Sequence, residues 1–211
     1  MMALQLEVIM AKVKERRPYI EGLKVAMRLE ALLKIYCERI EIAGSIRRRA
    51  PWVGDIELVA IPRKRYIQTL LGEQPVEKTY LDEHLEAYPD IYQMVRSGER
   101  MKQLLYEDFQ VDIFLTDPER WGVIFLLRTG SADFSKWLVT SRNQGGARAV
   151  DRIVKEGRVW EVGATEPLST PQEEHTFHAL GVPWVPLEQR HKGYWGVDME
   201  TWKPILTTQR C

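Results

Sequence analysis

Apolar positions recur along the chain with two different periods, and together they predict an α+β fold. From Tyr19 to Cys37 one stripe is apolar, with the spacing of a helix that packs on a sheet. The stripe consists of Val25, Ala26, Leu29, Leu32, Leu33 and Tyr36. Residues 40–61 instead form two apolar runs around a tight turn and a basic helical segment, which predicts a strand, a turn and a second strand.

Prolines and charge divide the flanking segments. Pro18 separates a basic helix predicted over residues 1–17 from the apolar-striped helix. Residues 63–72, after Pro62, look helical. Residues 73–90 are acidic and lack a clear period, so we expect either a helix or a loop there.

Alternation resumes in the middle of the chain. Residues 91–116 alternate and are broken at 97–100, which predicts a hairpin followed by a strand from Phe109 to Thr116. Asp117-Pro118 then has the sequence of a helix start, with proline in the first turn of a helix that runs to Leu127. Another helix is expected over 132–142.

A change in composition after Gly145-Gly146 predicts two domains, residues 1–146 and 147–211. In the second, residues 158–162 are a strand candidate. Thr170-Pro171-Gln172-Glu173 has the pattern of a capping box, so we expect a short helix that ends at Leu180 before a packed, tryptophan-containing tail.

Composition is that of an ordinary globular protein, with 45% hydrophobic and 28% charged residues among 211. No run approaches the ~20 apolar residues needed to span a bilayer, and the first residues lack a signal-peptide layout. Because Cys37 and Cys211 are the only cysteines, we expect a reducing, cytoplasmic setting without disulfides.

Charge is balanced overall but unevenly distributed. Residues 136–158 carry six Lys or Arg against two acids, whereas residues 73–90 carry six acids against one Lys. A basic face there, with Lys136, Arg142 and Arg148, permits contact with a DNA backbone.

Two carboxylates, Asp55 and Glu57, lie two residues apart on a predicted strand and therefore project from one face. Asp112 is a lone acid in another apolar strand, where burial is costly unless it binds a cation. If the two strands are neighbours, the three carboxylates form the kind of cluster that holds two Mg²⁺ ions. The alternatives are an exposed strand edge for the pair and an ion pair of Asp112 with Arg100.

A phosphate cradle is predicted just upstream, where Gly44 and Ser45 are followed by Arg47, Arg48 and Arg49. Backbone N–H groups, a hydroxyl and guanidinium forks converge there, as a triphosphate requires, although three arginines also suit a solvated surface. His175 and His178 lie three apart on a helix, but no Cys or further His completes a zinc set.

Four segments in order resemble the family X DNA polymerases, the group that includes DNA polymerase beta. They are Gly44-Ser45-Ile46-Arg47-Arg48 with Gly54-Asp55-Ile56-Glu57, Val111-Asp112-Ile113, Thr129-Gly130-Ser131 with Phe134, and a run of matches from Thr170 to Arg190. Together they cover about residues 40 to 190. The resemblance implies a minimal palm and thumb form: a nucleotidyltransferase palm with a mixed sheet and flanking helices, and a small α/β thumb.

The resemblance also implies roles for matched residues. Asp55 and Glu57 would bridge two Mg²⁺ ions, with Mn²⁺ as an alternative, and Asp112 would hold the catalytic ion near the primer 3′-hydroxyl. Ser45 and Arg48 would hold the β and γ phosphates of a nucleoside triphosphate. The other matched nucleotide-binding positions are Gly44, Gly54, Leu127, Arg128, Gly130, Ser131 and Ser135.

The chain departs from the family pattern at several of these positions. Glu57 replaces the usual Asp, and Leu127-Arg128 replaces the aromatic pair that helps to exclude the ribose 2′-hydroxyl. Ser135, followed by Lys136, replaces the Asn that contacts the minor-groove edge of the base, and Gln110 replaces the primer-contacting Arg. We therefore expect weak sugar discrimination and modest fidelity.

The function expected is metal-dependent, templated DNA synthesis on a primer-template or gapped duplex, in gap filling or repair, by a monomer. With 43 residues before Gly44, we expect no lyase domain and no 5′-deoxyribose phosphate lyase activity. A different nucleotidyltransferase, template-independent or acting on another acceptor, shares the palm and is the main alternative. A non-catalytic DNA-binding protein is the third, although its decayed palm would not need all three acids.

Overall fold

The computed structural model describes residues 15–70, 72–76 and 78–191, and the chain divides into two compact units. The first unit extends to Thr116 and the second begins at Asp117. This division falls well before the boundary expected between residues 146 and 147. The reason is that the helices after Thr116 pack into a core with Ala147, Val159 and Phe177 of the second unit.

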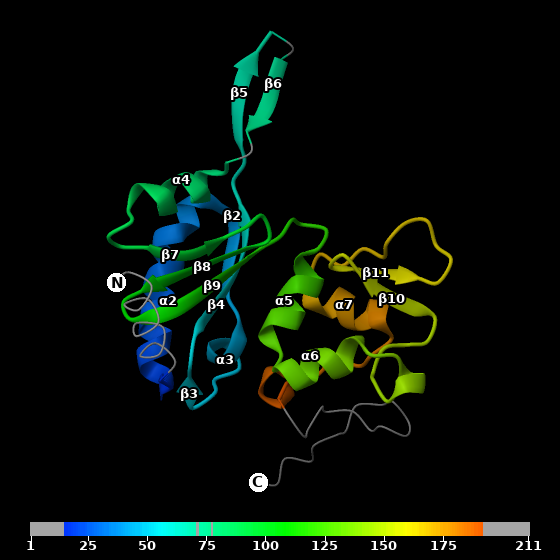
Figure 1. Ribbon diagram of the computed structural model, residues 1–211. Helices are drawn as coiled ribbons and strands as arrows, with labels where there is room; N and C mark the ends of the chain where they lie inside the picture. The colour runs from blue at the N-terminus through cyan, green and yellow to red at the C-terminus, as the bar shows by residue number, and fades with distance from the viewer. Residues whose placement is uncertain (1–14, 71, 77, 192–211) are drawn as a thin grey trace. The chain divides into compact units, whose positions relative to one another are not determined.

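The first unit is built on a five-stranded mixed sheet in the order β2-β4-β9-β8-β7 (Figure 1). Its strands are β2 (Cys37–Ile42), β4 (Ile56–Pro62), β9 (Phe109–Leu115), β8 (Met101–Tyr106) and β7 (Gln93–Ser97). Strands β4 and β9 are parallel, and the other neighbours are antiparallel. The predicted hairpin and the strand that follows it are thereby confirmed as β7, β8 and β9.

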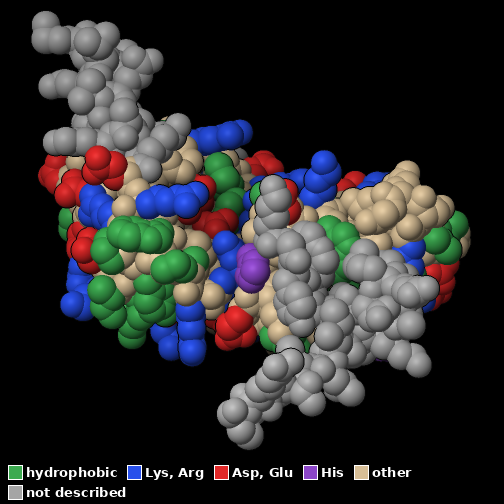
Figure 2. Space-filling model, turned by 90° about the horizontal axis from the view of Figure 1, so that it is seen from below, with side chains coloured by type: hydrophobic (Ala, Val, Ile, Leu, Met, Phe, Trp, Pro, Cys, Tyr) green, Lys and Arg blue, Asp and Glu red, His purple; other side chains and the backbone are tan. Residues whose placement is uncertain are grey.

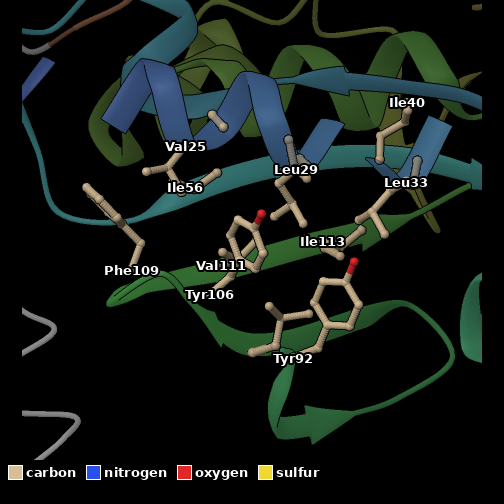
Figure 3. Packing of buried hydrophobic residues seen from close by; sticks show 14 of the residues in the cluster. Val25, Leu29, Leu33, Ile40, Ile56, Tyr92, Tyr106, Phe109, Val111 and Ile113 are labelled. Carbon is tan, nitrogen blue, oxygen red and sulfur yellow. The ribbon is translucent and has the colours of Figure 1, made fainter. Parts of the chain in front are cut away.

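Helix α2 (Tyr19–Leu33) covers one face of this sheet, as the apolar stripe predicted (Figure 3). Leu29 and Leu33 are fully buried against Ile56 and Val111 in one core cluster. Leu32 was wrongly placed in the stripe, since it is 49% exposed. Burying each of these four aliphatic side chains stabilises the unit by roughly 1.5–3 kcal/mol.

Short elements lie around the sheet. They are β1 (Arg17–Pro18), a 3-10 turn (Lys34–Tyr36), α3 (Gly44–Arg47), β3 (Trp52–Val53) and α4 (Tyr80–Ala87). The helix predicted over 1–17 falls mostly outside the described residues, and its last residue, Arg17, lies in strand β1. The acidic segment contains helix α4, one of the two alternatives left open for it.

Residues 63–72 do not form the predicted helix but the start of a hairpin, β5 (Arg65–Thr69) and β6 (Gly72–Val76). Tyr66, Ile67 and Thr69 favour strands over helices, because aromatic and β-branched side chains lose rotamer freedom in a helix. The hairpin projects from the first unit in Figure 1. The apolar run in residues 63–72 is too short to show a period that would distinguish a helix from a strand.

A buried ion pair joins α4 to β8. Asp82 Oδ1 lies 2.6 Å from Lys102 Nζ, with the side chains 13% and 10% exposed, and Asp82 also completes a capping box with Thr79. Burial raises the pKa of Asp82, but the hydrogen bonds from Lys102 and Thr79 outweigh it and hold the pKa below its usual value.

We expect Asp82→Asn to lower the free energy of unfolding by about 3 kcal/mol at pH 7, because Lys102 keeps a buried charge without its partner. Because the pKa of Asp82 is lower in the folded than in the unfolded protein, its carboxylate stabilises the folded state fully above the unfolded-state pKa of about 3.9. This stabilisation is lost as the pH falls through the lower, folded-state pKa. Urea unfolding at pH 7 and pH 3 checks this. A deficit equally large at pH 3 would contradict the electrostatic origin.

In its described part, up to residue 191, the second unit has three α-helices and a small hairpin. These are α5 (Trp121–Thr129), α6 (Ala132–Val139), a 3-10 turn (Arg142–Gln144), β10 (Arg152–Lys155), β11 (Arg158–Glu161), α7 (Glu173–Leu180) and a final 3-10 turn (Leu187–Gln189). Strands β10 and β11 pair antiparallel. Within the described ranges, no helix has the length and apolarity needed to cross a bilayer.

Helix boundaries differ from the predicted ones in this unit. Asp117 accepts hydrogen bonds from the backbone and side chain of Arg120, and this turn delays the start of α5 to Trp121. The predicted capping box at Thr170 is also wrong: its hydroxyl donates to the Glu119 carbonyl, and α7 begins only at Glu173. The stop after Leu180 is confirmed, with the next glycine in the left-handed conformation.

Candidate active site

The turn between β2 and α3 places Gly44 against the Glu57 side chain. Ala43 N donates to Glu57 O at 2.8 Å, which fixes the turn to strand β4. Gly44 has φ +62, and a Cβ there would lie 1.9 Å from Glu57 Oε2. Glycine is therefore required at this position for two reasons: the backbone is left-handed, and the Glu57 carboxylate occupies the place of a Cβ.

We expect Gly44→Ala to lower the free energy of unfolding by about 2 kcal/mol or more, because the positive φ and the clash with Glu57 act together. Gly72→Ala is the matched control in the same unit, since Gly72 has φ +95 but nothing within 4 Å of an added Cβ. The difference between the two variants in urea unfolding isolates the displacement of Glu57. Equal losses would show that Glu57 moves aside freely.

Ser45 presents a buried hydroxyl at the start of α3. Within the described residues its Oγ is buried and has no hydrogen-bond partner. A buried hydroxyl left unpaired costs about 1–3 kcal/mol, so a ligand that accepted its hydrogen bond would gain stability at this position. The predicted cradle residues Gly44, Ser45 and Arg48 thus lie in one turn.

Strand register brings the predicted carboxylates together. Glu57 of β4 and Asp112 of β9 are direct partners across a parallel pair, so their side chains project from the same face of the sheet. Asp55 lies one residue before the start of β4, and therefore two residues before Glu57. That face is opposite the one that carries Ile56 and Val111 against α2.

The charges of the three acids and of Arg48 interact with one another. Burial raises the pKa of Asp55, and the nearby charge of Asp112 raises it further, against the effects of its own backbone N–H and of Arg48. Burial lowers the pKa of Arg48, while Glu57 and Asp55 oppose that change. The site thus has three carboxylates on one face with the Arg48 guanidinium beside them, and the repulsion between Asp55 and Asp112 favours a bound cation.

Asp112 is held by two glutamines. Its Oδ1 accepts hydrogen bonds from Gln103 Nε2 at 2.9 Å and Gln110 Nε2 at 3.3 Å. The alternative ion pair with Arg100 is not observed in the described part of the chain. Because the glutamines are neutral, they orient the carboxylate without neutralising its charge.

The donor set suits a hard divalent cation, since Asp55, Glu57 and Asp112 offer carboxylate oxygens alone. As the side chains stand, no three His, Cys, Asp or Glu residues of the described ranges are grouped closely enough to hold a metal ion. The acids share a face, but their oxygens are not gathered around a point. His175 and His178, the weaker metal candidates, are both exposed on α7.

The Thr129-Gly130-Ser131 segment is the junction of α5 and α6. Ser131 Oγ accepts a hydrogen bond from Phe134 N and caps α6. Ser135 Oγ donates to Leu127 O at 2.7 Å. Gly130 allows this turn, because a Cβ there would lie 2.4 Å from the Phe134 ring. Both predicted hydroxyls are thus engaged within the second unit, while the Arg128 side chain is exposed.

The three predicted DNA-contacting residues differ in their surroundings. Arg142 donates to the carbonyls of Ala147 and Gly181, and Arg148 donates to those of Val139 and Ala149. These bonds hold the loop after α6 in place. Lys136 is exposed on α6, so it alone presents a cation with no such bond among the described residues.

Comparison with known proteins places the fold. No protein-family model matches the sequence, and no curated protein matches it. Two crystal structures of Leishmania infantum polymerase beta are similar, a ternary P/T complex (TM-score 0.65) and a ternary gap complex (TM-score 0.62), each 17% identical. They cover 86% of this chain, and 78% and 72% of theirs. The chain therefore has the fold of DNA polymerase beta, as the resemblance of its motifs predicted.

Proposed function

We propose that this protein is a metal-dependent nucleotidyltransferase that extends a DNA primer from a nucleoside triphosphate. The observation that carries the proposal is the pairing of Glu57 with Asp112 on parallel strands, beside the unpartnered hydroxyl of Ser45. An acidic face and an empty hydrogen-bonding position at a tight glycine turn are the two halves of a site for a metal-bound triphosphate.

The chain's own residues act on the phosphates and the acceptor. Ser45 Oγ donates to a phosphate oxygen, and Arg48 places its charge where negative charge accumulates on the leaving group. Gly44 leaves room for Glu57 to reach the same turn. Asp112, oriented by Gln103 and Gln110, supplies its carboxylate on the acceptor side.

Asp55, Glu57 and Asp112 would hold divalent cations, for which Mg²⁺ or Mn²⁺ fits the oxygen donors. Such ions acidify the attacking hydroxyl and neutralise the leaving pyrophosphate when bound. Charge stabilisation of this kind supplies most of the rate in phosphoryl and nucleotidyl transfer.

DNA is the acceptor that the comparisons favour. The Leishmania infantum structures are described as a P/T complex and a gap complex. The second unit of this chain has the Thr-Gly-Ser turn and the run of matches from Thr170 to Arg190 that resemble a polymerase thumb. A palm domain by itself does not determine which molecule accepts the nucleotide. A second candidate function is therefore the addition of nucleotides to a 3′ end without a template.

Primer extension on a one-nucleotide gapped duplex with Mg²⁺ or Mn²⁺ tests the proposal. Addition that follows the template base supports a templated polymerase, and equal addition of all four nucleotides supports the second candidate. No addition with either ion, by protein that still binds the duplex, would contradict the proposed activity.

We expect weak discrimination between deoxy- and ribonucleotides, because Leu127 and Arg128 replace the aromatic pair that excludes a 2′-hydroxyl in the resembling family. The ratio of kcat/KM for dNTP and rNTP on the same gap measures it. Comparable values are expected, and Leu127→Tyr should raise the preference for the deoxynucleotide. A wild-type preference above ~10³ would contradict the interpretation.

A further inference from the structure

A small exposed ribbon lies directly beside the phosphate cradle. Strands β1 and β3 pair antiparallel, with Arg17 opposite Val53 and Pro18 opposite Trp52. Because strand side chains alternate, Arg17 and Val53 share one face and Trp52 projects from the other. Arg16 continues β1 on that second face, where its Cγ lies 4.0 Å from the position of a Cβ on Gly54.

Trp52 is largely exposed to solvent, although it lies in a strand next to a buried residue. Its side chain is 56% exposed, whereas Val53, next to it, is fully buried. The ribbon is fixed to the unit, since Tyr19 N donates to Pro51 O at 3.0 Å and Arg17 lies over the Phe109 ring. A large, rigid aromatic surface is thus presented to solvent at low entropic cost to a partner.

Arg49 supplies a second, independent observation. It has φ 56, a left-handed conformation that a long side chain adopts only with strain, and that glycine would adopt freely. Its side chain is exposed and, like that of Arg16, makes no hydrogen bond or ion pair within the described residues. The Arg49 guanidinium is thus exposed and available to a ligand outside the chain.

We propose that Trp52, Arg16 and Arg49 form a contact surface for single-stranded DNA, with a base stacked on Trp52 and the guanidinium groups on flanking phosphates. Aromatic rings interleaved with cations suit a single strand, in which bases are free to stack. Trp52, Arg16 and Arg49 are all exposed. Figure 2 shows, on the face of the first unit that it presents, Lys and Arg side chains next to hydrophobic ones. Glu15 and Glu21 flank β1 in the sequence and reduce the net positive charge of this surface.

This surface deepens the proposed function, on which it rests, because it would hold an unpaired strand next to the site of transfer. It is tested apart from catalysis, by fluorescence anisotropy of a labelled oligothymidylate without nucleotide or metal. Trp52→Ala should weaken binding about tenfold, and Trp52→Phe should keep most of it. Arg49→Gly should reduce the salt slope of log K by about 0.7.

Arg49→Gly separates contact from folding, because it relieves backbone strain. We expect its midpoint of urea unfolding to rise while its DNA affinity falls. Glu156→Gly removes the same strain at φ 54 in the second unit, and Arg100→Ala removes an exposed charge elsewhere; both should bind like the wild type. Wild-type affinity in Trp52→Ala and Arg49→Gly would overturn the proposal, whether or not the protein extends primers.

Discussion

Asp112→Asn is expected to reduce primer extension at least about 10³-fold while leaving duplex binding unchanged. The substitution keeps the size of the side chain and its ability to accept the hydrogen bond from Gln103, but it removes the charge. A carboxylate that holds a catalytic cation contributes several kcal/mol of charge stabilisation, and each 1.4 kcal/mol corresponds to tenfold in rate.

The same variant should fold normally. Burial and the charge of Asp112 both raise the pKa of Asp55, so removal of the Asp112 charge relieves repulsion instead of breaking an attraction. The free energy of unfolding of Asp112→Asn should therefore equal or exceed that of the wild type. An inactive but stable variant distinguishes loss of chemistry from loss of structure.

Asp108→Asn provides the matched control, because Asp108 is an exposed acid four residues away in the β8–β9 turn. It should retain wild-type kcat and KM. Single-turnover extension on a gapped duplex, with duplex affinity measured in parallel, compares the two variants. If Asp112→Asn keeps near wild-type turnover, Asp112 has no part in the chemistry and the proposed site fails.

The core of the candidate site could be predicted from the sequence because its residues are close in the chain or set by a regular period. Gly44, Ser45 and Asp55 lie within one strand, turn and strand unit. The neighbour relation of Glu57 and Asp112 depends on the parallel pairing of β4 with β9, which no local pattern could determine. The sequence left it as a condition, that the two strands be neighbours.

The glutamines that hold Asp112 were missed as partners, because the register that pairs one of them with Asp112 is set by a turn that the sequence did not identify. Glu107 and Asp108 both have positive φ, as in a two-residue hairpin turn that pairs Tyr106 with Phe109. Counting back along that register places Gln103 opposite Asp112. The period alone gave the strands, and the turn type was needed to give the partners.

The predictions that failed did so for different physical reasons. Residues 63–72 form part of a hairpin, although no local period separated strand from helix. Thr170 has the sequence of a helix cap, yet its hydroxyl bonds to Glu119, far away in the chain. The DNA contact of Arg142 and Arg148 stays a prediction. Their guanidinium groups also donate hydrogen bonds to backbone carbonyls of the loop after α6, which no local sequence pattern indicated.

The C-terminal matches to the thumb motif have a common physical explanation. Arg190 is fully buried, and its Nη1 lies 2.7 Å from Glu173 Oε1 with that side chain 5% exposed. The guanidinium lies over the rings of Phe177 and Trp184, and Arg190 O accepts a hydrogen bond from Ser131 N. The cluster therefore ties the end of the described chain to the Thr-Gly-Ser turn.

Glu173→Gln is consequently expected to lower the free energy of unfolding of the second unit by about 3–5 kcal/mol, because it leaves the buried Arg190 charge without its counter-ion. Arg190→Met should lower the free energy of unfolding by a similar amount, because it leaves the buried Glu173 carboxylate without a cation. The double variant Glu173→Leu with Arg190→Met removes both charges, and it should lose less than either single change. Urea unfolding followed by tryptophan fluorescence measures the cycle, and additive losses would show that the two side chains act independently.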